Sequence, residues 1–246
     1  MSSALVLPEQ AELIGWQRPR HLWVPPAATS AGPEVVELAQ GAGLDLDPWQ
    51  GFILDGSLGE TAAGYWVCFE VAEIVPRQNG KGGVIEAREL GGLFLFNEEL
   101  ILHSAHEFKT AQEAFRRIRF LIENTPDLEK RVLRISTSHG DEGIELKSLP
   151  TIIAGAGARF TRVGKAPRLR FVARTGGSGR GFSGDCVILD EAFNLPSQVI
   201  TALMPTLSAR RNPQLWYASS PVNQEEHPHG HVLARIRAGV LEHGFA

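Results

Sequence analysis

The chain has 246 residues, a formal net charge of −4 and a hydrophobic fraction of 43%. It is long enough to bury a substantial core, and its charge excludes a uniformly basic protein that coats nucleic acid. The two cysteines, Cys68 and Cys186, lie in apolar runs, which predicts buried thiols and no disulfide framework. The chain has no run of 18 apolar residues, so no membrane span is predicted, and the N-terminus lacks the pattern of a signal peptide.

Residues 1–45 are rich in Pro, Ala and Gly, and we expect them to form an arm or cap. Trp16 and Trp23 are expected to pack this arm on a main domain over residues 46–246. Within that domain, the aromatic and β-branched run 65–75 predicts a buried strand. A helix is predicted over 84–96.

Strands and helices then alternate along the chain, which predicts an α/β fold with a parallel sheet and helices on its faces. The segment 132–175 has short alternating stretches that predict antiparallel strands. The remaining predicted strands are 100–106, 186–189 and 215–219, and the remaining predicted helices are 108–124, 195–208 and 231–239.

The stretch 75–83 reads VPRQNGKGG and follows the first predicted strand. The usual phosphate loop has Gly where this chain has Val75, and Ser or Thr where it has Gly82. A Gly-Lys pair alone also fits an ordinary turn. Between a strand and a helix, however, backbone N–H groups and the helix dipole favour an anion, and glycines allow its close approach. We therefore expect Lys81 to reach the outer phosphates of a nucleotide, with Arg77 on the same loop.

The segment 186–191 reads CVILDE, four apolar residues followed by two carboxylates. A buried strand would deliver Asp190 at its carboxyl end, where α/β sheets bind their ligands. Asp190 can hold Mg²⁺, and Glu191 can orient and deprotonate a water molecule. The alternative is a strand that ends in a solvated acidic turn. Together with the loop, the pair favours ATP hydrolysis, and Gly82 predicts that Asp190 carries more of the metal binding than usual.

These motifs, in this order, resemble the ATPase domain of tailed-phage large terminases over most of the chain. LDPWQ, with Trp49 and Gln50, resembles the motif on the adenine side, and PRQNGK resembles the family's deviant phosphate loop. RGFSGD followed by VILDEA, residues 180–192, resembles its acidic strand, and YASSP, residues 217–221, resembles its coupling motif.

The resemblance implies a phosphate-loop NTPase of the additional-strand, catalytic-glutamate class. Such a fold has a mainly parallel central sheet with flanking helices and an antiparallel extension. ATP and Mg²⁺ are the implied cofactors. The implied partners are double-stranded DNA, a portal, a small terminase subunit and further copies of the chain in a homo-oligomeric ring of five. The implied location is the host cytoplasm, at the procapsid, with no membrane.

The family's site residues can be carried over to matching positions. The resemblance implies that Gln50, beside Trp49, reads the adenine and that Arg77 contacts the γ-phosphate. It also implies Mg²⁺ binding by Asp190 and water activation by Glu191. The residues implied to wrap the phosphates are Gln78, Asn79, Gly80, Lys81, Gly82 and Gly83, and those implied to couple hydrolysis to movement are Ser219, Ser220 and Pro221.

Between Arg159 and Arg180 the chain has seven basic residues and no acidic one. This segment is either a surface that faces DNA or a neighbouring subunit, or a solvated hairpin face. Arg174 and Arg180 are the candidates for an arginine finger on the next subunit's ATP. By contrast, the cluster Arg116, Arg117 and Arg119 is expected to be a solvated helix face.

Terminases usually also contain a metal-dependent nuclease, which needs clustered carboxylates. No Asp follows Asp190, so we expect no nuclease domain in this chain. It would then be either an isolated domain or a separate gene product. Two alternative functions stay open. One is a helicase-like ATPase, for which the chain is short. The other is a nucleotide-binding protein that assembles a ring without hydrolysis, which Gly82 favours and Glu191 opposes.

Overall fold

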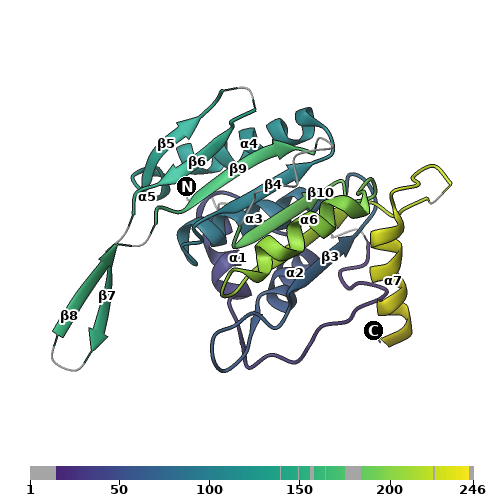
Figure 1. Cartoon of the computed structure of the whole chain (residues 1–246), viewed down its shortest axis with the longest axis horizontal. Coiled ribbons are helices and arrows are strands. Elements are labelled where there is room, and N and C mark those ends of the chain that lie inside the picture. Colours follow the sequence, from purple (N-terminus) through teal and green to yellow (C-terminus); the bar gives the residue numbers. More distant parts are fainter. Residues whose placement is uncertain are drawn as a thin grey trace, which may run out of the picture.

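A seven-stranded sheet forms the centre of the molecule (Figure 1). The computed structural model describes residues 15–138, 140–148, 150–155, 158–163, 165–174, 184–223 and 225–243, with only the backbone for 150–163. The strands of the sheet, in spatial order, are β3 (Glu70–Ile74), β11 (Gln214–Ser219), β10 (Cys186–Asp190), β4 (Ile101–Ala105), β9 (Arg168–Ala173), β6 (Gly143–Leu146) and β5 (Val132–Ser136).

The first five of these strands are parallel, and β6 and β5 extend the sheet in antiparallel fashion. The predicted α/β fold, a mainly parallel sheet with an antiparallel extension, is thus confirmed. The antiparallel strands expected in 132–175 are present, but β9, which is antiparallel to β6, also pairs in parallel with β4 on its other side. The alternation in RLRFVA buries Leu169 and Phe171 equally well in either direction, so the pattern cannot decide the pairing.

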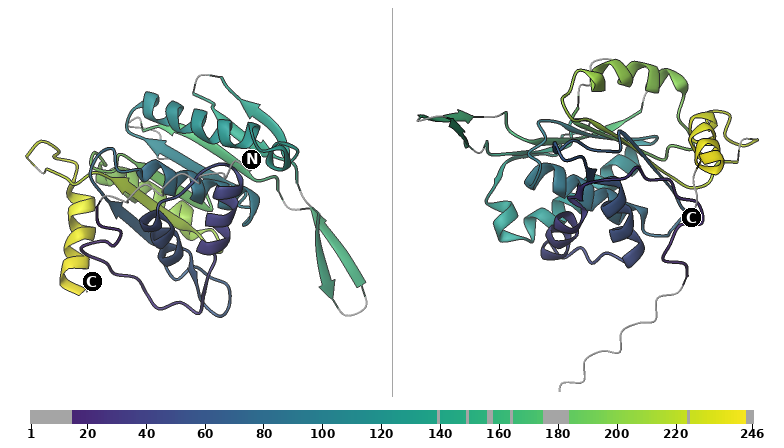
Figure 2. Two further views of the ribbon diagram at one scale, coloured as in Figure 1. Left: turned by 180° about the vertical axis from the view of Figure 1, so that it is seen from behind. Right: turned by 90° about the horizontal axis from the view of Figure 1, so that it is seen from below.

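Helices cover both faces of the sheet, as the edge-on view in Figure 2 shows. On one face lie α1 (Gly32–Gly41), α2 (Pro48–Ser57), α3 (Lys81–Phe94), α4 (Phe108–Glu123) and α5 (Pro126–Glu129); the other face carries α6 (Ser197–Ser208) and α7 (His231–His243). A short pair, β1 (Thr29–Ser30) and β2 (Gly59–Glu60), lies beside them. The ribbon formed by β7 (Pro150–Gly155) and β8 (Ala158–Val163) extends away from the body (Figure 1).

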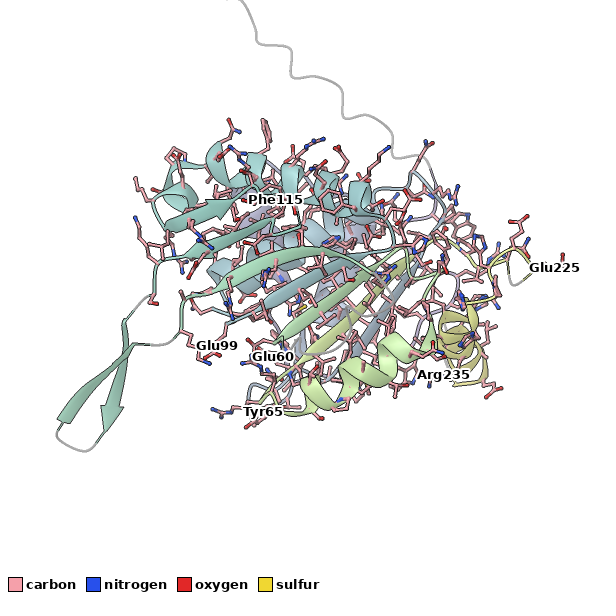
Figure 3. The ribbon with its side chains drawn as sticks, turned by 45° about the horizontal axis from the view of Figure 1, so that its top comes forward. Glu60, Tyr65, Glu99, Phe115, Glu225 and Arg235 are labelled. Atoms are coloured by element: carbon pink, nitrogen blue, oxygen red, sulfur yellow. The ribbon has the colours of Figure 1, made fainter. Side chains whose placement is uncertain are left out.

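The main core lies between the sheet and α3, the most deeply buried helix. Its Arg88 is fully buried and forms two hydrogen bonds with Glu98, at 3.0 and 2.6 Å. Phe115 of α4, labelled in Figure 3, packs edge-on against Phe171 of β9 with ring centroids 5.5 Å apart. Helix α1 adds Val35 and Ala39 to the same core, so part of the expected arm packs as an ordinary layer of the domain.

Several sequence expectations differ from the structure at their edges. The strand predicted over 65–75 is shorter, Glu70–Ile74, and Cys68 before it is only half-buried, whereas Cys186 is buried as expected. Trp16 is 93% exposed and Trp23 57% exposed, so the prediction that they pack the N-terminal arm on the domain is wrong. Within the described part of the chain, no helix is long and apolar enough to cross a membrane.

Candidate functional site

The Gly-Lys loop connects the carboxyl end of β3 to the first turn of α3. Gly80 has φ 79° and Gln78 has φ 61°, both left-handed, so the backbone turns sharply just before the helix begins. Gly80 adopts this conformation without a Cβ penalty. The Lys81 amine donates to the carbonyls of Val75 and Pro76, at 3.4 and 3.2 Å. The lysine therefore lies across the loop that the sequence predicted to hold phosphates.

Gln50 connects α2 to this loop. Its Nε2 donates to the Gly80 carbonyl at 2.7 Å, and its Oε1 accepts a hydrogen bond from the Asp47 amide at 2.6 Å. A Cβ atom at Gly83 would lie 2.7 Å from the same Nε2, so a side chain there would displace the Gln50 amide. Gln50 is 6% exposed, and both ends of its amide are already bonded. In this arrangement Gln50 braces the loop, and Trp49 lies beside it.

The acid pair lies at the carboxyl end of β10. Asp190 accepts a hydrogen bond from the Glu191 amide through Oδ1, at 2.8 Å. Glu191 has φ 53°, a left-handed conformation that is strained for a residue with a side chain. Its Oε2 is buried and has no hydrogen-bond partner in the described ranges. Because β10 and β3 are parallel and only β11 separates them, the acid pair and the loop lie at the same edge of the sheet.

The end of β11 contacts both of these segments. The Val75 amide of the loop donates to the Ser219 carbonyl at 3.1 Å, and the Ala192 amide donates to the Ala218 carbonyl at 3.1 Å. Ser219 is buried, and its hydroxyl donates to the carbonyl of Ser220, which precedes Pro221. The segment with the predicted coupling residues is therefore the backbone connection between the loop and the acidic turn.

The predicted arginines lie in different surroundings. The guanidinium of Arg77 lies 6.0 Å from the ring centroid of Phe193, which follows the acid pair. Arg174 is half-buried, and its guanidinium donates to carbonyl oxygens of its own chain at the end of β10. Arg180 lies outside the described residues.

Sequence reasoning missed Glu73, which is 3% exposed at the end of β3. It is in register with Ala218 and, one strand further, Asp190, so the two acidic residues face the same space above a small side chain. Neither of its carboxyl oxygens has a hydrogen-bond partner among the described residues. Burial, reinforced by the charge of Asp190 and partly offset by Lys81, raises the pKa of Glu73 to about 8.

His103 and Arg117 also belong to this layer. The ring of His103 is 2.6 Å from Glu89 Oε1 and 4.0 Å from Asp190 Oδ2. Burial lowers the pKa of His103, but the charge and hydrogen bond of Glu89 together with the charge of Asp190 outweigh burial, and the net pKa is raised. Arg117 forms an ion pair with Glu86, and a Cβ atom at Gly82 would lie 3.0 Å from its Nη2. Arg117 is exposed, as expected for a solvated helix face, and its guanidinium also lies beside the start of α3.

The oxygen atoms at this edge fit a Mg²⁺ ion bound together with a nucleotide. Mg²⁺ is usually bound through one or two carboxylates, several waters and the phosphates of the substrate. Asp190 and Glu73 provide carboxyl oxygens of this kind. Over the described ranges, no group of three or more His, Cys, Asp or Glu could hold a metal ion by itself. An ion at this site would therefore depend on the phosphates.

Taken together, the strand order, with β11 inserted between the loop strand and the acidic strand, defines an α/β NTPase fold. Among solved structures, the chain is similar to the large terminase of bacteriophage HK97, with a TM-score of 0.59 and 20% sequence identity over 78% of this chain. The match spans 38% of the HK97 protein. The chain thus has the fold of the matched part of the HK97 large terminase.

Two further similarities are to the large terminase ATPase domain of Thermus phage P74-26 and to the large terminase of a thermophilic bacteriophage in complex with ADP. The first has a TM-score of 0.47 and 22% identity, and covers 62% of this chain and 59% of that one. The second has a TM-score of 0.43 and 11% identity, and covers 63% and 34%. No protein-family model matches the sequence, and the search of curated proteins found no match.

Proposed function

We propose that the chain is the ATPase motor domain of a viral DNA-packaging terminase, which hydrolyses ATP to move double-stranded DNA into a procapsid. One observation carries the proposal: the Lys81 loop and the Asp190–Glu191 pair lie at one edge of a parallel sheet, separated by a single strand. The fold shared with the HK97 large terminase supports the same assignment.

In this proposal the loop binds the triphosphate. The N–H groups at the start of α3 face the phosphates, where the helix dipole favours negative charge. Lys81 exchanges the carbonyls of Val75 and Pro76 for the β- and γ-phosphates. Gln78 to Gly83 surround the phosphate chain, Trp49 and Gln50 lie on the adenine side, and Arg77 contacts the γ-phosphate.

Asp190 and Glu191 divide the chemistry between them. Asp190 would hold Mg²⁺, which when bound neutralises charge on the phosphates. Glu191 has a carboxylate oxygen with no partner in the described part of the chain, so it is free to accept a proton from water. The water oxygen then bonds to the γ-phosphorus, the bond to the β–γ bridging oxygen breaks, and ADP leaves with that electron pair.

Ser219, Ser220 and Pro221 would pass this event on. The carbonyls at the end of β11 accept hydrogen bonds from both the loop and the acidic turn. A shift of either segment when the γ-phosphate is lost therefore moves the end of β11. The proposed partners are DNA, a portal, a small terminase subunit and four further copies of the chain in a ring in the host cytoplasm. Arg174 and Arg180 are the candidates for the finger that reaches the next site.

Steady-state ATP hydrolysis tests the proposal and separates it from a ring protein that binds ATP without hydrolysis. We expect Glu191→Gln to lower kcat by about 10²- to 10⁴-fold, the usual contribution of a general base, with little change in ATP affinity. Glu37→Gln, an exposed change on α1, serves as the control and should leave kcat unchanged. Equal rates for wild type and Glu191→Gln would contradict the proposal.

A helicase-like ATPase would share this chemistry but would use it to separate the strands of a duplex. Two assays distinguish the functions: packaging of DNA into procapsids, measured as nuclease-protected DNA, and strand separation on a forked duplex. The proposal expects ATP-dependent protection of DNA and no strand separation.

A further inference from the structure

Arg174 connects the ends of three strands beneath the acid pair. It directly follows β9, and its amide donates to the Ala105 carbonyl at the end of β4, at 2.8 Å. Its Nη1 donates to the Ser104 carbonyl at 2.6 Å. Its Nη2 donates to the carbonyls of Asp190 at 2.6 Å and Glu191 at 3.1 Å. The arginine thus anchors the acidic turn to β4.

The two carbonyls that Nη2 contacts belong to the peptide groups on either side of the Glu191 Cα atom. Fixing both peptide groups fixes φ and ψ of Glu191, the residue in the strained left-handed conformation at φ 53°. Such strain costs about 1–3 kcal/mol and persists only where surrounding contacts impose it. Two further bonds help: the Glu191 amide to Asp190 Oδ1, and the Ala192 amide to the Ala218 carbonyl.

The environment of Arg174 is unusual for a residue that only stabilises the fold. Its hydrogen bonds in the described part of the chain all end on backbone oxygens, and its Nε is buried without a partner there. Burial lowers the pKa of the guanidinium to about 10, although Asp190 and Glu191 partly oppose this. Burying a charge without a paired carboxylate costs stability, so this arrangement indicates a role for Arg174 other than stabilising the fold.

We propose that Arg174 is a positioning residue for Glu191 within its own subunit: it holds the left-handed turn that aims the carboxylate at the attacking water. This inference rests on the proposed ATPase function. It assigns to Arg174 a role inside its own site, and it leaves Arg180 as the candidate that reaches a neighbouring subunit.

The first test separates binding from turnover. A misplacement of about 1 Å can cost about 10²-fold in rate, so Arg174→Ala should lower kcat by about 10- to 100-fold. Affinity for a non-hydrolysable ATP analogue should stay within about twofold, because the hydrogen bonds of Arg174 within the described residues end at β4 and the acidic turn and not on the loop. Arg174→Lys, which keeps the charge but loses the fork, should lie between wild type and Arg174→Ala. Arg134→Ala on the exposed face of β5 is the control and should match wild type. If Arg174→Ala binds the analogue, which shows that it is folded, and its kcat is unchanged, the proposal is overturned.

The second test separates action within a subunit from action on a neighbour. Arg174→Ala and Glu191→Gln subunits are mixed in equal amounts and ATP hydrolysis is measured. Positioning within the subunit predicts no recovery, because no site then contains both residues from one chain. A finger that reaches across subunits would restore activity at mixed interfaces, and that result would also overturn the proposal.

Hydrogen exchange gives a readout that does not depend on activity. Arg174→Ala should speed exchange of the amides of Glu191 and Ala192, with the amides of residues 80–83 unchanged. If the wild type hydrolyses no ATP but this local change appears, the proposed ATPase function fails while the structural role of Arg174 stands. If exchange at these amides is unaffected, the positioning role is refuted whatever the ATPase result.

Discussion

The buried carboxyl of Glu73 makes the stability of the protein depend on pH in a defined direction. Its pKa is about 8 in the folded protein and 4.5 when unperturbed, because burial and the neighbouring Asp190 disfavour its charged form. The folded state therefore holds one proton more than the unfolded state between pH 4.5 and 8. Stability from this group is fully present below about pH 4.5 and is lost as pH rises towards 8.

Glu73→Gln removes this dependence while keeping the shape of the side chain. A difference of one bound proton changes the free energy of unfolding by about 1.4 kcal/mol per pH unit. From pH 5.5 to 7.5, wild type should therefore lose up to about 2.7 kcal/mol relative to Glu73→Gln. Other titrating groups, His103 included, are common to both proteins and cancel in the comparison.

Urea unfolding at pH 5.5, 6.5 and 7.5, without nucleotide or Mg²⁺, measures the difference. Glu37→Gln, at an exposed position on α1, is the matched control, and its difference from wild type should not change with pH. Parallel stability curves for wild type and Glu73→Gln would refute the reasoning, since they would show that Glu73 is ionised in the folded protein at these pH values.

Two further predictions concern the loop. Gln50→Ala removes the hydrogen bonds to the Gly80 carbonyl and from the Asp47 amide, and should lower the free energy of unfolding by about 1–3 kcal/mol. Urea unfolding measures this loss, with Gln40→Ala at an exposed position as the control. A loss no larger than that of Gln40→Ala would contradict the prediction. Gly82→Ser introduces the hydroxyl that the usual phosphate loop has at this position, next to the half-exposed Arg117, which can move aside. Calorimetry should show an affinity gain of about 1 kcal/mol for the Mg²⁺–nucleotide and none for nucleotide alone; an equal gain in both would exclude a metal contact.

Local sequence patterns predicted the elements that carry the loop and the acid pair. CVILDE is a short apolar run with carboxylates at its end, and it forms β10 with Asp190 at the carboxyl edge. The Gly-Lys stretch follows a strand and starts a helix, as expected. The helix begins at Lys81 rather than 84, because the loop supports its first turn through the Gly83 to Gly80 hydrogen bond despite the low helix propensity of glycine.

Tertiary contacts decide what the patterns could not. Glu70 and Glu73 are three residues apart in EVAEI and therefore lie on opposite faces of β3, and the pattern does not show which face is covered; in the structure Glu70 is exposed and Glu73 is buried on the face of Val71. The direction of β9 depends on the connection through β5 to β8. Only the direction parallel to β4 brings Arg174, which follows β9, within hydrogen-bond distance of the Glu191 carbonyl. Arg117 is exposed like Arg116, but it lies where α4 meets α3 and forms an ion pair with Glu86. No local signal distinguishes these cases.

The central claim is that Lys81 and Asp190 act on one triphosphate. Calorimetric titration of a non-hydrolysable ATP analogue, with and without Mg²⁺, into wild type, Lys81→Ala, Asp190→Asn and the double variant tests it most directly. We predict that Lys81→Ala weakens binding in both conditions and that Asp190→Asn abolishes only the gain from Mg²⁺. In the double variant the two losses should not add independently. Wild-type Mg²⁺ dependence in Asp190→Asn, or fully additive losses, would contradict a shared site.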